Sequence, residues 1–434
     1  MKLILVELNE INFDAVRHYL DKGEKLPGLK VIIESGLLST VAEQEYEHLE
    51  PWIQWPSVHT GKKYNEHKVF RLGDFVSSEH VQFFEKVEDA GYRVGAISPM
   101  NATNNLKTPA YFIPDPWTQT PTDGSFLSRS VSSAVSQAVN DNSQSKLTFI
   151  TVVNLGLSFF ALVSPLRFIS MLRYAVSAFG KPWRKALFLD LLLHEIHKTL
   201  FRRKKPQFST LFLNAGAHIQ HHYFYNSSFV TSAALENPSW YIDEKEDPFF
   251  EMLKVYDYVV QDLLAMSDVE IIIATGLSQR PYDQLKFYYR LKDHERFLRD
   301  LDIRFLNVVP RMTRDFLITF ESEDQAIAAA EKLDKIFVCN RIKLFEEIDN
   351  RGKDLFVVLT YPNEILDSTT ITYGGRCTKL LQYVTFVAIK NGEHQGKGFA
   401  YFSEGIKLMA PPEASHVAMI HNTVLKYFNV PHEK

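Results

Sequence analysis

The sequence contains very little cysteine. Only Cys339 and Cys377 occur among its 434 residues. Two cysteines cannot form the disulfide framework on which many small secreted domains depend, so a reducing compartment is the default expectation. The first seven residues reach charged side chains too early for a secretory signal and instead predict a core strand. We therefore expect a cytoplasmic protein.

The sequence also lacks a strong imbalance of charge. Lys and Arg number 48 against 52 Asp and Glu, which gives a formal net charge of -4. Proteins that mainly bind nucleic acid usually carry a basic domain or patch, so we expect no nucleic-acid partner. Hydrophobic residues make up 45% of the chain, which is typical of a folded globular protein. The length suits one large α/β domain with insertions or two ordinary domains.

Long hydrophobic runs are scarce as well. Residues 147–164 carry no charge, but a run of 18 residues is at the lower limit for a membrane span. Its first part, 147–153, predicts a buried strand better than a transmembrane helix. The next segment, 166–205, is basic and has apolar residues at helical spacing. It predicts either a helical cap over a pocket, which we favour, or helices in peripheral contact with an anionic membrane.

Strand-like and helix-like segments alternate in the first hundred residues. Strands are predicted at 2–7, 37–43 and 92–97, and helices at 11–22, 27–36 and 81–90. This alternation, with short links that contain glycine, predicts a mostly parallel sheet with helices on both faces. Further along, residues 316–320, 324–336 and 355–360 predict a βαβ-like unit that forms a separate small lobe.

A histidine-rich segment follows a predicted strand. Residues 210–213 form a short apolar run that ends at Asn214, and His218, His221 and His222 follow. In α/β proteins, chemistry is concentrated at the carboxyl ends of the sheet strands. Asn214 and His218 are four residues apart, so one helical turn directs both side chains to the same point. The segment predicts a metal site, and a His-rich surface loop is the alternative.

Six short motifs follow one another along most of the chain. They are the strand and turn at 5–9, the helix at 55–61 with His67 after it, the Asn214–His218 pair, the strand and turn at 271–278, the segment 392–402, and a final helix followed by 430–431. In this order they resemble the alkaline phosphatase superfamily, closest to its type I phosphodiesterase/nucleotide pyrophosphatase branch.

The resemblance implies an α/β fold. It is an alkaline-phosphatase-like three-layer sandwich with a mostly parallel central sheet, a helical insertion and a small βαβ-like lobe. We accordingly assign residues 1–114, 206–312 and 362–434 to the core, 115–205 to the helical cap insertion, and 313–361 to the small α+β lobe.

Members of this superfamily hold two divalent metal ions, usually zinc, around a Thr or Ser nucleophile. The resemblance places Asn9, Gly276 and Leu277 at ligand positions of the first metal, and Pro51 near the nucleophile position. Glycine and leucine cannot ligate a metal through their side chains. We therefore expect the first metal site and the covalent nucleophile to be lost.

The ligand positions of the other metal are better kept. Asn214, His218 and His394 fall on them and predict one divalent ion, zinc or manganese. Asn214 stands where the superfamily has an Asp, so one carboxylate ligand is missing. Glu50, His221 and His222 are the candidates to replace it.

Two classes of function fit these residues. The first is a metal-dependent hydrolase or transferase acting on a phosphoester or related ester, with Glu50 as general base and His222 as a second catalytic candidate. Flat aromatic side chains beside polar ones suit a glycan or nucleotide-sugar substrate, although two tryptophans can equally belong to the core. The residues predicted to bind substrate are Asn9, Trp52, Trp55 and His67. The second class is a binding or regulatory protein that keeps the fold without catalysis.

Overall fold

The computed structural model describes residues 1–140, 156, 162–311 and 314–431. The chain divides into two compact units. The sheet unit comprises Met1–Val230, Glu244–Pro281 and Gly392–Lys434, and the second unit comprises Thr231–Asp243 and Tyr282–Asn391. The second unit extends beyond the predicted lobe at 313–361, because elements on both sides of that range share its hydrophobic core.

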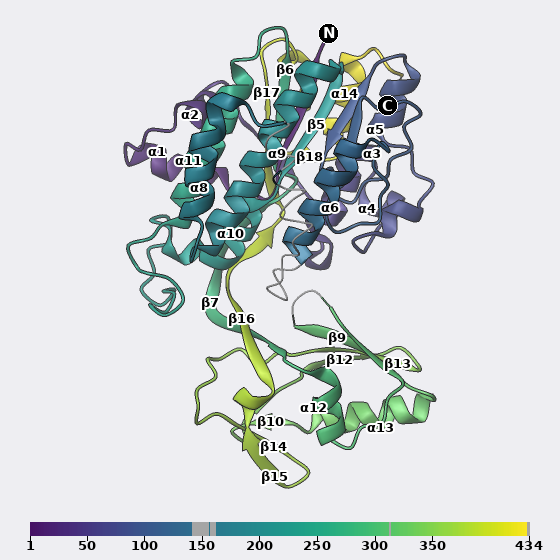
Figure 1. Cartoon of the computed structure of the whole chain (residues 1–434), viewed down its shortest axis with the longest axis vertical. Helices are drawn as coiled ribbons and strands as arrows, with labels where there is room; N and C mark the ends of the chain where they lie inside the picture. The colour runs from purple at the N-terminus through teal and green to yellow at the C-terminus, as the bar shows by residue number, and fades with distance from the viewer. Residues whose placement is uncertain (141–155, 157–161, 312–313, 432–434) are drawn as a thin grey trace. The chain divides into compact units, whose positions relative to one another are not determined.

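An eight-stranded sheet forms the centre of the sheet unit, in the order β18-β2-β17-β6-β1-β5-β3-β4 (Figure 1). The strands are β1 (Leu3–Leu8), β2 (Leu38–Val41), β3 (Val94–Ile97), β4 (Tyr111–Ile113), β5 (Phe208–Leu213), β6 (Glu270–Ala274), β17 (Lys397–Phe402) and β18 (Ser415–His416). β1 is parallel to both β5 and β6, and β3 is parallel to β4 and β5. β17 is antiparallel to β2 and β6. The prediction of a mostly parallel central sheet is confirmed.

Helices cover both faces of this sheet. Every residue of β1 and β5 is buried, which explains why both strands are almost continuously apolar. One face packs on α3 (Pro51–Thr60), α5 (Phe83–Asp89) and α14 (Met419–Tyr427). The other layer contains α2 (Pro27–Glu34), α9 (Pro182–Lys204), α10 (Ala215–Tyr223) and α11 (Pro248–Leu264). The result is the predicted three-layer arrangement.

The described part of the 115–205 insertion is helical. It contains α6 (Phe126–Asn140), α8 (Phe168–Ser177) and α9. Helix α9 packs against β3 and β5, so it belongs to a layer of the sandwich. Most of the uncharged run at 147–164 lies outside the described residues. Within the residues that are described, no helix has the length and apolar character needed to cross a membrane.

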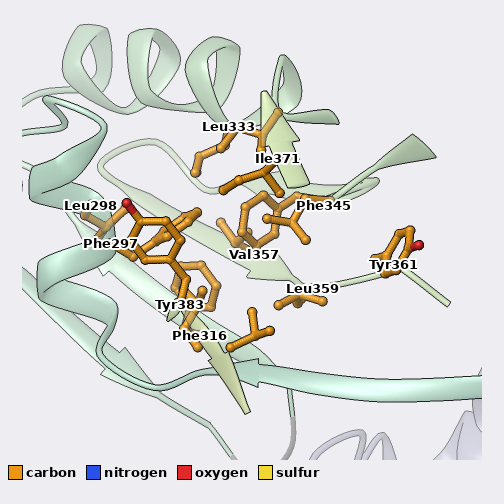
Figure 2. Packing of buried hydrophobic residues seen from close by; sticks show 14 of the residues in the cluster. Phe297, Leu298, Phe316, Leu333, Phe345, Val357, Leu359, Tyr361, Ile371 and Tyr383 are labelled. Carbon is orange, nitrogen blue, oxygen red and sulfur yellow. The ribbon is translucent and has the colours of Figure 1, made fainter. Parts of the chain in front are cut away.

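The second unit has its own core of buried aromatic and aliphatic side chains. Figure 2 shows Phe297 and Leu298 of α12 (His294–Asp300) packed with side chains from other elements of the same unit. Its two four-stranded sheets have the orders β12-β13-β9-β8 and β11-β10-β14-β15. Their strands are β8 (Asn307–Pro310), β9 (Asp315–Thr319), β10 (Phe337–Val338), β11 (Ile342–Lys343), β12 (Glu347–Asn350), β13 (Asp354–Val358), β14 (Thr370–Tyr373) and β15 (Arg376–Lys379).

The predicted βαβ order is present in the second unit as β9, α13 (Glu323–Asp334) and β13. The two strands nevertheless pair antiparallel, because β12 forms a hairpin with β13 and reverses the chain before β13 reaches β9. Two long paired strands, β7 (Ser278–Leu291) and β16 (Val384–Gln395), each contain residues of both units.

Candidate metal site at the carboxyl edge of the sheet

Three neighbouring parallel strands end at the same edge of the central sheet. β1 is followed by Asn9 and Glu10, β5 by Asn214, and β6 by Thr275. Backbone hydrogen bonds join these three chain segments. The amide of Asn9 donates to the carbonyl of Leu213 at 3.1 Å, and the amide of Glu10 donates to the carbonyl of Thr275 at 3.0 Å. This is the edge at which open α/β sheets place their ligand sites.

Glu10 has an unusual backbone conformation at this edge. Its φ is 64°, in the left-handed region that non-glycine residues seldom adopt. Two further contacts hold this conformation, because the Glu10 carbonyl accepts from Gln220 Nε2 at 2.8 Å and from the Gln279 amide at 3.2 Å. The turn aims a carboxylate with only 2% exposure at the histidines of the edge. Strained residues of this kind are concentrated at functional sites.

Two histidines from distant parts of the sequence converge on the Glu10 carboxylate. His221 lies on α10 and His394 lies near the end of β16. Their Nε2 atoms are 3.2 Å and 3.1 Å from the same Glu10 oxygen, Oε2. The two Nε2 atoms are 3.3 Å from each other. Ligand atoms of all three residues lie within 4.8 Å of one another, which is a spacing suited to one shared cation.

Electrostatics keep the Glu10 carboxylate charged. Its burial opposes ionisation, but the nearby imidazoles of His394 and His221 outweigh that effect and hold the pKa of Glu10 well below its usual range. Asn9 Nδ2 donates to the other carboxylate oxygen at 3.0 Å, and Gln279 Nε2 donates to Oε2. Neutral amide donors therefore orient both carboxylate oxygens, while the two imidazoles face Oε2.

Glu50 reaches the same cluster from the start of α3. Its Oε2 atom is 3.5 Å from Nδ1 of His394, on the side of the ring away from Glu10. The side chain of Glu50 makes no capping hydrogen bond to α3. A carboxylate at the far nitrogen of a metal-binding imidazole fixes the tautomer and orientation of the ring. The geometry of Glu50 suits this positioning role more directly than the role of general base.

The other predicted ligands lie beside this group. Asn214 Oδ1 accepts from Asn9 Nδ2 at 2.8 Å, so the amide of Asn214 forms part of the network behind Glu10. His218 packs against His222, with ring centroids 4.7 Å apart, and burial lowers the pKa of His218 to about 4. Of the two predicted histidine ligands, His394 is in the cluster that brings three ligand atoms together and His218 is not.

Two residues predicted to bind substrate are buried instead. Trp55 has no exposed surface, and its indole Nε1 donates to Asn9 Oδ1 at 2.8 Å. His67 is also buried; its Nδ1 accepts from the Val69 amide and its Nε2 lies 3.0 Å from Ser57 Oγ. Burial lowers the pKa of His67 to about 4. The two rings are buried for different local reasons, because Trp55 lies on α3, which packs its residues into the sheet core, whereas His67 ends α4 (Tyr64–His67) and lies against Ser57 of α3.

The remaining predicted substrate residues have different surroundings. Asn9 is almost fully buried and bridges Trp55, Glu10 and Asn214 through its side-chain amide. Trp52 is only partly buried, and its indole Nε1 donates to the carbonyl of Phe70 at 3.1 Å. Asn9 therefore supports the site from behind, whereas Trp52 keeps part of its surface accessible.

A second group of potential ligands lies between α9 and α11 and suits a metal less well. His194 Nε2 is 3.0 Å from Asp262 Oδ2, and Glu195 is close by. The ammonium of Lys198 pairs with both carboxylates, at 3.3 Å from Glu195 and at a short distance from Asp262. The Tyr258 hydroxyl lies within hydrogen-bond distance of both carboxylates and can donate its proton to either one. A lysine already supplies the positive charge here, so this group is an ion-pair network.

The sequence reasoning missed Glu10 as a ligand. Its position in the sequence could have identified it, because Glu10 directly follows Asn9 at the end of the first predicted strand, where ligands are expected. His221 was considered only as a substitute for a missing carboxylate. What the sequence did not reveal is that the chain turns at Glu10 with a positive φ, which directs its side chain toward α10 and β16.

Several solved structures are similar to the chain over nearly its full length. Phosphonoacetate hydrolase from Sinorhizobium meliloti is 13% identical, with a TM-score of 0.40 over 98% of this chain and 95% of that one. Murine ectonucleotide pyrophosphatase/phosphodiesterase 5 is 10% identical, with a TM-score of 0.42 over 100% and 97%. Alkaline phosphatase from the Antarctic bacterium TAB5 is 10% identical, with a TM-score of 0.38 over 99% and 99%.

These structural neighbours are alkaline phosphatase superfamily proteins. At such low identities and with TM-scores below 0.5, however, they support neither a substrate nor a mechanism for this chain. No family model matches the sequence, and no curated protein matches it.

Proposed function

We propose that this alkaline-phosphatase-like chain is a metal-dependent hydrolase or transferase that acts on a phosphoester or related ester through a single metal site. The observation that carries the proposal is the convergence of Glu10, His221 and His394 at the carboxyl edge of the sheet, with ligand atoms within 4.8 Å of one another. The glutamate and the two histidines come from three distant parts of the chain, so their meeting depends on the complete fold.

The donor chemistry fits a divalent transition-metal ion. Two imidazole nitrogens and one carboxylate oxygen are a ligand set found in catalytic zinc sites, which keep a further position open. Manganese is the alternative, since it accepts the same nitrogen and oxygen donors. Such an ion would supply a Lewis acid that polarises a phosphoryl or carbonyl oxygen. The chain would contribute Glu10, His221 and His394 as ligands.

The residues around the ligands hold them in position. Asn9 and Gln279 donate to the Glu10 carboxylate. Glu50 lies at Nδ1 of His394 and would keep the proton there, which makes Nε2 of His394, the nitrogen beside Glu10, the one that would bind a cation. These contacts come from the protein's own side chains and hold the three ligands in position.

The packing of Trp55 supports a single metal. Its indole donates to Asn9, and its Cε2 atom lies 3.2 Å from where a Cβ on Gly276 would be. The buried ring thus lies against two of the three residues that the superfamily resemblance places at the first metal, Asn9 and Gly276. Pro51 opens α3 and offers no hydroxyl nucleophile. We accordingly propose direct attack by water or another acceptor, without a covalent enzyme intermediate.

The finer proposal concerns the substrate. The substrate we propose is a sugar-containing phosphoester, such as a glycan or nucleotide-sugar derivative. Of the two tryptophans predicted to contact it, Trp52 is the one that is partly exposed. A second candidate function is a binding or regulatory protein without catalysis. Two observations favour it: Trp55 is buried against Asn9, where the resemblance places the first metal, and Pro51 offers no hydroxyl at the nucleophile position. It would use the same cluster to bind a ligand or metal without turnover.

Calorimetric titration with Zn²⁺ and Mn²⁺ tests the metal site. Wild type should bind one ion per chain, and Glu10→Gln and His221→Ala should each weaken binding strongly. His218→Ala is the matched control, because it removes a histidine from the same helix but outside the cluster, and it should bind like wild type. Loss of binding in His218→Ala with normal binding in His221→Ala would refute the proposed ligand set.

Turnover is tested separately with the metal-loaded protein. Aryl phosphate monoesters, phosphodiesters and phosphonate esters are suitable probes of a phosphoester hydrolase. Hydrolysis that is lost in His221→Ala and kept in His218→Ala would support the enzyme. Stoichiometric metal binding without hydrolysis or transfer of any of these probes would favour the non-catalytic binding protein.

A further inference from the structure

Helix α8 presents an apolar row to solvent on the surface of the sheet unit. Ile169, Leu172 and Val176 lie three and four residues apart and are therefore on one face of the helix, and Phe179 continues the row just beyond its end. The exposed fractions of these four side chains range from 52% for Leu172 to 93% for Phe179. Single exposed apolar residues are common, but four in one row are not.

The opposite side of α8 already has partners. Met171 and Tyr174 line a cavity of about 510 Å³ together with Leu191 of α9 and Val255 of α11. Met171 is buried, and α8 packs on α9. The helix therefore has a core-facing side, and the row from Ile169 to Phe179 is a second apolar surface that the described residues of this unit leave exposed.

The sequence segment that carries this row has charge of one sign. Residues 164–189 contain five basic residues and no acidic residue. Two of the five point to acidic groups of the same unit, since Lys181 pairs with Glu246 and Arg184 pairs with Glu251. Arg173 and Lys185 are exposed; Arg173 directly follows Leu172 of the row, and Lys185 lies in the first turns of α9, six residues after Phe179. The surface therefore combines protruding apolar side chains with excess positive charge.

We propose that α8 docks this unit on an anionic membrane surface, with Ile169, Leu172, Val176 and Phe179 entering the boundary between headgroups and acyl chains. A helix with apolar and basic side chains lies in the interface plane and responds to anionic lipids. Lysine and arginine near such a surface add electrostatic attraction that decays within a Debye length. A protein partner is less suited to this surface. Each partner of a standard protein interface contributes roughly 800 Å² of surface, and a single row of four side chains offers a smaller area than that.

The experiment uses the full chain and flotation with vesicles of phosphatidylcholine alone or with 30% phosphatidylserine. Wild type should float only with the anionic vesicles, and high salt should weaken the binding. Val176→Ser and Phe179→Ser together should lower the partition coefficient at least about tenfold. Arg173→Ser and Lys185→Ser should each lower it about fivefold. These side chains are on the surface, so circular dichroism should show unchanged folding.

Leu408→Ser is the matched control, because Leu408 is fully exposed and lies outside the insertion. It should float like wild type. Absence of wild-type flotation, equal flotation with neutral vesicles, or α8 variants that float like wild type would each overturn the proposal. So would a dimer in light scattering that Val176→Ser converts to monomer, since a second copy of the chain would then cover this face.

Discussion

Replacing Trp55 by Phe tests whether this residue is part of the core or a substrate contact. The indole has no exposed surface and donates to Asn9 Oδ1 at 2.8 Å. Truncation of a buried Phe or Trp to Ala costs about 3–5 kcal/mol, and Phe keeps one aromatic ring, so the smaller ring should cost about 1–2 kcal/mol. Leaving the buried Asn9 oxygen without this donor adds about 1–3 kcal/mol. We expect Trp55→Phe to lower the free energy of unfolding by about 2–5 kcal/mol in total.

The assay is urea unfolding followed by circular dichroism, with Trp52→Phe as the control. Trp52 is partly exposed, and its indole donates to a carbonyl near the surface, that of Phe70. Water can replace that bond, so we expect a loss below about 1 kcal/mol. If Trp55→Phe and Trp52→Phe had the same free energy of unfolding, the conclusion that Trp55 is packed in the core would be refuted. A variant of normal stability with lost ligand binding would restore Trp55 as a substrate contact.

Three further predictions concern the site and its supports. Glu50→Ala should weaken zinc binding about 10–100-fold in calorimetry, because Glu50 orients His394, and unchanged affinity would show that it does not. Burial lowers the pKa of His67 to about 4, so below about pH 6.5 the unfolded chain takes up a proton that the folded chain does not. His67 should therefore lower the free energy of unfolding by about 1 kcal/mol for each unit that the pH falls from about 6.5 to 4. The urea midpoint of His67→Gln should accordingly change less with pH than that of wild type. Gly276→Ala should lower stability by about 1–2 kcal/mol in the same unfolding assay, since φ is 71° and its Cβ would press on Trp55; an unchanged midpoint would contradict this.

Much of the fold could be read from the chain itself. β1 and β5 are apolar and short, and each is followed by polar residues, so both their strand character and the location of chemistry at their ends were predictable. The alternation of strands and helices predicted the three-layer sandwich with a mostly parallel central sheet. For the small lobe, the sequence predicted the order of strand, helix and strand but not how the strands pair. β9 and β13 are antiparallel because β12 forms a hairpin with β13, and apolar periodicity does not encode strand direction.

Three-dimensional packing decided which side chains form the site. Helix α10 carries His218, His221 and His222, and positions three and four residues apart on a helix differ in direction by tens of degrees. The rotation of α10 is set by its buried residues, among them Gly216, where a Cβ would lie 2.1 Å from Ile11 Cδ1. That rotation turns His221 toward Glu10 and leaves His218 packed on His222.

The sequence thus determined that histidines and polar residues gather at one edge of a parallel sheet. It did so because strand ends and helix starts are local features of apolar pattern and turn residues. Only the tertiary structure selected Glu10, His221 and His394, since their meeting requires a positive φ at Glu10, one rotation of α10 and the return of β16 to the sheet edge. Each of these depends on contacts between residues far apart in the chain, which no local pattern records.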